Sequence, residues 1–173
     1  MQVSVKQVFT AIIVMICTLG VLFGGQRLYQ RTVVQSPLVA SLGTIAGVRN
    51  AHLKQGTVTV QMEPRADLMN VYRAVYRAAD EKLGHAPAAI NIENHSSAAL
   101  NQVAQSAAFM VAQGEATGQY VAMQSNIQKL AAHHGTFAHV ELGNHHLYLT
   151  FRQGGRVLYQ VVPVQIGGAS HAS

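Results

Sequence analysis

The stretch TIAGVRNAHLKQGTVTVQMEP, residues 44–64, decides the fold of the central part of this chain. Apolar residues from Val58 to Met62 alternate with polar ones, as in a strand that has one buried and one wet face. Residues 48–53 form a second predicted strand before it, with apolar side chains at Val48, Ala51 and Leu53, and Gly56 lies between the two strands. Because glycine adopts positive φ without strain, this position suits a tight turn. The stretch therefore predicts a β-hairpin.

Helices are predicted on both sides of this hairpin. Ser36 and Pro37 suit the N-cap and the first position of a helix that ends at Gly47. Downstream, apolar residues recur from Leu68 to Leu83 at the three- and four-residue spacing of a buried helix face.

A third strand completes this part of the chain. AAINIEN, residues 88–94, alternates apolar and polar side chains once more. The predicted order over residues 32–94 is therefore α-β-β-α-β. Such an order is satisfied by one small sheet with two helices packed on one face.

This α-β-β-α-β pattern resembles the ring-building modules of membrane-anchored sporulation and secretion-channel proteins, and also extracytoplasmic sporulation lipoproteins. The residues that carry the resemblance are Leu42, Ile45, Gly47, Val48, Ala51, Gly56, Val58, Val60, Asp67, Leu68 and Val71. The resemblance implies lateral association of such modules around a channel. The chain departs from the lipoproteins because Ile16, not a small residue, precedes its one cysteine, Cys17.

The same hairpin also resembles the second half of heavy-metal-carrier domains, which bind metal through a C-x-x-C loop. With Cys17 as its single cysteine, the chain has neither that loop nor an intrachain disulfide. We therefore do not expect metal transport by thiolate chemistry.

The N-terminal residues 1–26 are predicted to form a transmembrane anchor. Residues 8–25 are almost wholly apolar, and a spanning helix needs roughly 17–25 such residues. A cleaved signal peptide is the alternative, but its apolar region is usually about 7–15 residues and ends at a small-x-small site that is missing here. Because the tail before the anchor is very short, we expect residues 27–173 to be extracytoplasmic.

Charge is scarce rather than concentrated. The chain has 12 basic and 7 acidic residues, and its charged fraction of 11% is well below the roughly 25% of average soluble proteins. The basic residues are spread along the chain, so we expect no nucleic-acid partner. Arg73 and Arg77 share one face of a predicted helix, where a solvated surface is the ordinary explanation.

Residues 96–134 are predicted to form a long helical segment with very few charges. The glycines in QGEATGQ, residues 113–119, predict a break or a kink, which leaves either two helices or one bent helix. Gly114, Gly118 and Ala122 form a small-xxx-small row. Such a row allows close approach of helices, either within the chain or between subunits.

Antiparallel β-hairpins are predicted over residues 136–165, followed by a disordered tail over 166–173. A two-residue turn at Gly143-Asn144 would pair Leu142 with His145. In that hairpin one face is apolar, and Tyr148 lies on the opposite, polar face.

The polar face of this hairpin holds the one plausible metal site. His139, Glu141 and His146 are ligand types that zinc accepts, with Glu141 opposite His146 in the predicted register. No fourth ligand is evident, and a polar sheet face with ordinary cross-strand pairs is the alternative. Asp67 and Asp80 flank the helix over residues 68–83, and we expect neither to have a suitable partner nearby.

Overall, the sequence predicts an α+β protein in which a transmembrane helix precedes the small domain, the long or kinked helix and the hairpins. Since nucleophile-elbow, zincin, P-loop and dinucleotide motifs are all missing, we expect neither an enzyme nor a bound cofactor. The expected function is that of a membrane-anchored extracytoplasmic scaffold that contacts the lipid bilayer and forms homo-oligomers or joins a membrane complex. The alternatives are a ligand- or metal-binding sensor that uses the histidine-bearing hairpin, or a pilin-like secretion component.

Overall fold

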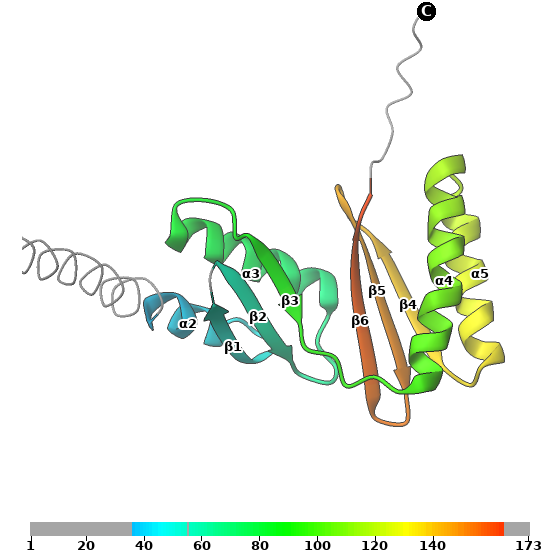
Figure 1. Ribbon diagram of the computed structural model, residues 1–173, viewed down its shortest axis with the longest axis horizontal. Coiled ribbons are helices and arrows are strands. Elements are labelled where there is room, and N and C mark those ends of the chain that lie inside the picture. Colours follow the sequence, from blue (N-terminus) through cyan, green and yellow to red (C-terminus); the bar gives the residue numbers. More distant parts are fainter. Residues whose placement is uncertain (1–35, 55, 165–173) are drawn as a thin grey trace, which may run out of the picture.

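The computed structural model describes residues 36–54 and 56–164, which form an α+β structure (Figure 1). These residues contain four helices and two three-stranded sheets. The predicted anchor over residues 1–26 and the predicted tail over 166–173 lie outside them. Among the helices described, none combines the length and the apolar character that a bilayer span needs.

The first half of the described chain has the predicted α-β-β-α-β order. Its elements are α2 (Ser36–Gly43), β1 (Val48–Lys54), β2 (Thr57–Met62), α3 (Leu68–Leu83) and β3 (Ala89–Ile92). β1 pairs antiparallel with β2, and β2 pairs parallel with β3. The turn between β1 and β2 has Gly56 at φ 78°, as its position in the sequence predicted.

Local signals at both ends explain α3. The Asp67 side chain accepts a hydrogen bond from the Asn70 N–H at 2.7 Å and caps the first turn. Gly84 has φ 72° and ends the helix in the left-handed conformation. Between them, one apolar face packs against the alternating buried residues of β2, so α2, α3 and the first sheet share one core.

The helix α2 ends at Gly43, whereas the sequence predicted an end at Gly47. The backbone N–H groups of Thr44 and Ile45 bond to carbonyls three residues back, which tightens the helix end into turns. Gly47 has another role: at φ 90°, a Cβ there would lie 2.7 Å from the Cβ of Ala66. A glycine at this position therefore lets the chain pass close to the loop before α3.

The second half of the described chain is a helical hairpin on an antiparallel sheet (Figure 1). Its elements are α4 (Ala98–Thr117), α5 (Tyr120–His133), β4 (Phe137–Leu142), β5 (His146–Gln153) and β6 (Arg156–Pro163). Side chains of both helices and of one sheet face form a second core, with Leu147, Leu149 and Phe151 fully or almost fully buried.

The long helical segment is two helices, not one bent helix. Gly118 has φ 70° and caps α4, and α5 starts at Tyr120. The break therefore lies at the second of the two glycines, Gly118, at the end of the segment where the sequence predicted it.

The hairpin of β4 and β5 has the predicted faces but not the predicted register. Leu142 pairs with Leu147 rather than with His145, and the bend lies at Asn144 and His145. The shift moves the pairing by two positions, so each side chain stays on its predicted face. Gly143 does not have positive φ; it is needed because a Cβ would lie 2.9 Å from a ring carbon of Tyr148.

The outer face of this second sheet is not a wet polar face. Tyr148 and Tyr159 are only 3% and 4% exposed and join the core formed by α2, α3 and the first sheet. The sheet is therefore covered on both faces, by α4 and α5 on one side and in part by α3 on the other.

The segment after β3 fastens the two halves to each other. The Asn94 side chain accepts a hydrogen bond from the Tyr159 N–H at 2.6 Å and donates one to the Tyr159 carbonyl at 3.3 Å. His95 forms a bridge of two backbone hydrogen bonds with Val157. The edge of β6 is thus partly occupied by the connecting segment.

Candidate functional site

His139 and Glu141 lie on the same face of β4 and contact each other. The distance from His139 Nε2 to Glu141 Oε1 is 3.4 Å. The other carboxylate oxygen, Oε2, is buried and has no hydrogen-bond partner among the described residues. A buried carboxylate oxygen without a partner is costly unless a cation or a water molecule approaches it.

Asp67 completes a cluster with these two side chains. One ligand atom from each of Asp67, His139 and Glu141 lies within 4.8 Å of the others. The N-cap position of α3 thus brings Asp67 up to β4 from the other half of the chain. The prediction that Asp67 has no suitable partner was therefore wrong, since its only local signal was that of a helix cap.

His146, the third predicted ligand, is not part of this cluster. In the observed register Glu141 pairs with Tyr148, and His146 lies at the start of β5. Its ring packs against Tyr72 and Tyr148, with centroid distances of 5.5 and 6.1 Å. Burial lowers the pKa of His146, and the neighbouring His145 lowers it further, so the neutral imidazole is favoured.

One imidazole and two carboxylates form a donor set that divalent zinc, manganese or iron accepts. Three protein ligands leave further coordination positions for water or another ligand. A bound cation would satisfy Glu141 Oε2, which has no hydrogen-bond partner among the described residues. This oxygen therefore favours a cation site more than a carboxylate oxygen already solvated by water would.

A groove of about 660 Å³ lies between α3 and the turn that joins β4 to β5. Its lining residues are Tyr72, Arg73, Tyr76, Arg77, Asp80, Asn144, His145, His146 and Tyr148. Burial raises the pKa of the Tyr72 phenol, and the nearby Tyr148 and Tyr76 raise it further, so Tyr72 keeps its hydroxyl proton at neutral pH. The groove was not predicted, because its two walls come from distant parts of the sequence.

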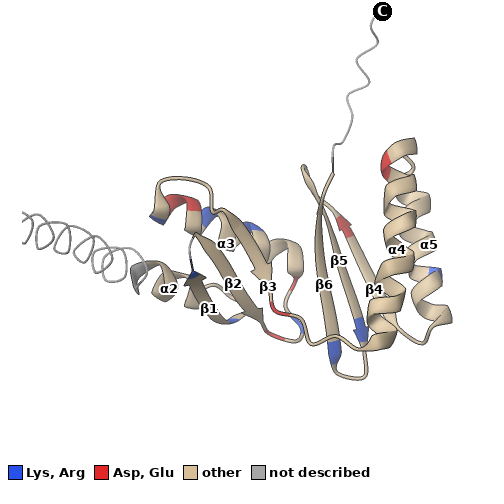
Figure 2. Ribbon diagram, in the orientation of Figure 1, with Lys and Arg blue, Asp and Glu red and all other residues tan. Residues whose placement is uncertain are grey.

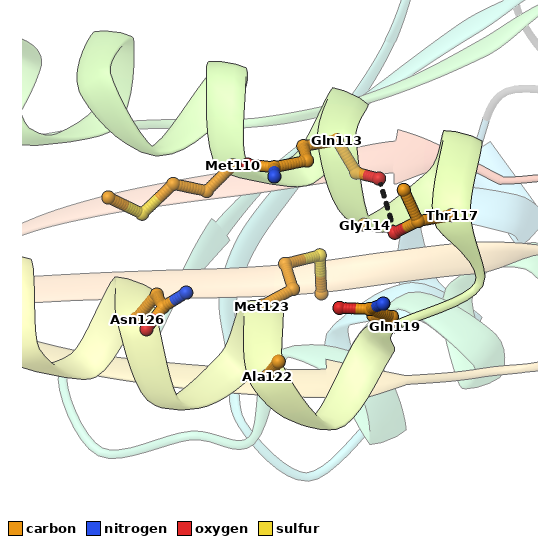
Figure 3. A pocket seen from close by; sticks show the side chains of 8 residues that line it. All are labelled: Met110, Gln113, Gly114, Thr117, Gln119, Ala122, Met123 and Asn126. Carbon is orange, nitrogen blue, oxygen red and sulfur yellow. Dashed lines mark hydrogen bonds between the residues drawn. The ribbon is translucent and has the colours of Figure 1, made fainter.

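The small residues Gly114, Gly118 and Ala122 lie on both sides of the break between α4 and α5 rather than along one helix. A Cβ at Gly114 would lie 2.7–2.9 Å from atoms of Met123, so the close approach there is between two helices of the same chain. The two glycines belong to the end of α4, and Ala122 lies on α5. Gly114 and Ala122 line a hollow of about 40 Å³, shown in Figure 3, which is too small for an organic ligand.

Comparisons with protein-family models, with curated proteins and with solved structures found no match to this chain.

Proposed function

We propose that this protein is a single-pass membrane-anchored, extracytoplasmic scaffold or assembly module that acts through protein–protein contacts. The main support is the α-β-β-α-β unit over residues 36–92, whose core lies on one face of the sheet. Within the described residues, no further strand pairs with the outer edges of β1 or β3. Open edges of this kind are suited to lateral association.

The other face of the first sheet is polar and partly exposed. Arg49, His52 and Asn91 are exposed there, and Thr57 and Thr59 are half-buried. Among the described residues, this face lies between two edges that pair with no further strand, so another module could contact the face and an edge together.

The hairpin of α4 and α5 supplies a second contact surface. Glu115 and Lys129 are its only acidic and basic residues apart from histidines, and Figure 2 shows how little of it is charged. Phe109 and Val121 are 80% and 83% exposed. A low-charge surface with large exposed apolar side chains is typical of a contact site for another protein.

The proposed anchor over residues 1–26 would hold this unit beside the bilayer. Tethering to a membrane raises the effective concentration of neighbouring copies, so weak lateral contacts suffice. The proposal includes no catalytic step, no cofactor and no nucleic acid.

Cysteine crosslinking in membranes tests the assembly role. In a Cys17→Ser background, His52→Cys on β1 and Asn91→Cys on β3 would be carried by separate, co-expressed full-length chains and treated with a short bis-maleimide. Separate chains are needed because both residues flank Thr59 on one sheet face and would crosslink within a single chain. We expect crosslinked dimers, whereas the pair Glu81→Cys and Arg156→Cys, exposed residues away from the polar face of the first sheet, should give far fewer. A strictly monomeric chain that also crosslinks to no other membrane protein contradicts the proposal.

A second candidate function is metal sensing by the histidine-bearing hairpin. The specific observation in its favour is the cluster of Asp67, His139 and Glu141. Calorimetric titration of the full chain with zinc should show binding that His139→Ala abolishes and His146→Ala retains. The absence of heat at micromolar protein rules this function out.

A further inference from the structure

We infer that the groove between α3 and the β4–β5 turn binds an acidic, extended peptide segment of a partner protein. This inference goes beyond the assembly role, because the groove lies apart from the edges of the first sheet and would bind the segment in a monomer as well.

The groove presents two arginines in a defined arrangement. Arg73 and Arg77 are exposed residues four apart on α3, so they lie on the same helix face with Cβ atoms roughly 5–6 Å apart. The opposite wall is formed by the turn that carries His145 and His146. Both walls belong to regular elements or to a tight turn, so the positively charged side chains are supported by an ordered backbone.

These arginines are available for a ligand. Neither Arg73 nor Arg77 forms an ion pair with a residue of the described ranges, and Asp80 is the single carboxylate that lines the groove. The whole chain has 12 basic and 7 acidic residues, so a second copy is a poor source of carboxylates. Charge complementarity therefore favours a different, acidic partner.

The chemistry of the lining selects carboxylates on an extended chain. Guanidinium groups bind carboxylates through paired hydrogen bonds, and the protonated Tyr72 hydroxyl adds a donor. Alternate side chains of an extended peptide lie roughly 6–7 Å apart on one side, close to the spacing of Arg73 and Arg77. The aromatic ring of Tyr76, which is 42% exposed, offers apolar surface to the methylene groups between the carboxylates.

The size and charge of the groove distinguish this ligand from a nucleic acid. A volume of about 660 Å³ accommodates a few residues of peptide. Nucleic-acid surfaces use long basic tracks, whereas this groove has two arginines, with Asp80 beside them.

The test uses the full-length protein in detergent and two peptides, acetyl-(Glu-Ala)₃-amide and its counterpart with glutamine in place of glutamate. The chain has no tryptophan and six tyrosines, three of which line the groove, so tyrosine fluorescence reports on binding. We expect saturable binding of the glutamate peptide, weakened at least tenfold by glutamine. Equal binding of the two peptides, or no binding of either, overturns the inference.

Matched variants locate the site. Arg73→Ala with Arg77→Ala should weaken binding at least tenfold, and both residues are exposed on a helix, where alanine is well tolerated. Arg49→Ala with Arg65→Ala removes the same charge elsewhere and should weaken binding less than threefold. Arg73→Lys with Arg77→Lys keeps the charge but loses the paired hydrogen bonds, so an intermediate affinity is expected. Equal losses in the two alanine pairs overturn the inference, as does tighter binding of inorganic phosphate or of oligo-dT than of the glutamate peptide.

Discussion

At the scale of single residues, His146 links the geometry of the groove to pH. Its ring lies against Tyr72 and Tyr148, and its pKa is lowered first by burial and then by His145. In the unfolded chain the histidine has its ordinary pKa of about 6.5. Below that pH the unfolded state therefore binds more protons than the folded state, which favours unfolding.

The prediction is that His146 makes the protein less stable as the pH falls. Its favourable contribution is complete above about pH 6.5 and is lost as the pH drops toward the lowered folded-state pKa. Urea unfolding at pH 8 and at pH 5 should show a larger loss for the wild type than for His146→Gln. His52→Gln, on the exposed face of the first sheet, is the control and should keep the wild-type loss. Identical losses in all three proteins contradict the assignment.

At the scale of elements, the packing of α4 on α5 depends on Gly114. Alanine is the better helix former by about 1 kcal/mol, which alone would make Gly114→Ala stabilising. The new Cβ, however, would lie 2.9 Å from the Cβ of Met123, which is buried and tied to its backbone. Overpacking of this kind costs about 1–3 kcal/mol, so the steric term prevails.

We therefore expect Gly114→Ala to lower the free energy of unfolding by about 1 kcal/mol net. Chemical denaturation measures it. Gly43→Ala is the matched control, since nothing lies within 4 Å of the place that a Cβ would take there, and it should be neutral or mildly stabilising. Adding Met123→Ala to Gly114→Ala should remove the steric part of the loss in unfolding free energy. If a double-mutant cycle shows no coupling between the two positions, Gly114 is not a packing residue.

Still at the scale of elements, local signals predicted the first half of the fold well. The strand over Thr57–Met62 and the helix up to Leu83 follow from alternation, from the Asp67 cap and from Gly84, all of which act within a few residues. The predicted register of β4 with β5 was wrong because Gly143 is required by its close contacts with Tyr148 and Arg73, not by the conformation of a turn. Contacts of that kind leave no local pattern in a sequence.

The candidate sites show the same division. His139 and Glu141 lie on one face of β4, as predicted, because residues two apart on a strand share a face. Asp67 and the arginine groove could not be predicted, because both depend on how α3 packs against the second sheet. Strand alternation assigned Tyr148 to the polar face, and its burial could not be predicted because α3, from a distant part of the sequence, covers that face.

At the scale of the whole molecule, the two cores are joined by few polar contacts, and Asn94 makes the shortest of them. Its side chain pairs with both backbone groups of Tyr159 and so acts as an additional residue of the sheet next to β6. The groove and the Asp67 cluster each take residues from both halves, so their geometry depends on this junction.

Asn94→Ala should therefore affect both stability and the relation between the halves. It leaves the Tyr159 N–H without its acceptor, which costs about 1–3 kcal/mol, and it should speed hydrogen exchange at Tyr159 and Val157 more than in α4 or α5. Asn91→Ala, exposed on β3, is the control and should change neither. Asn94→Asp keeps the acceptor and loses the donor, so its effect should be smaller. If hydrogen exchange at Tyr159 is unchanged in Asn94→Ala, packing of Tyr148 and Tyr159 alone holds the two halves together. In that case the groove of Asn94→Ala should bind the peptide as well as the groove of the wild type does.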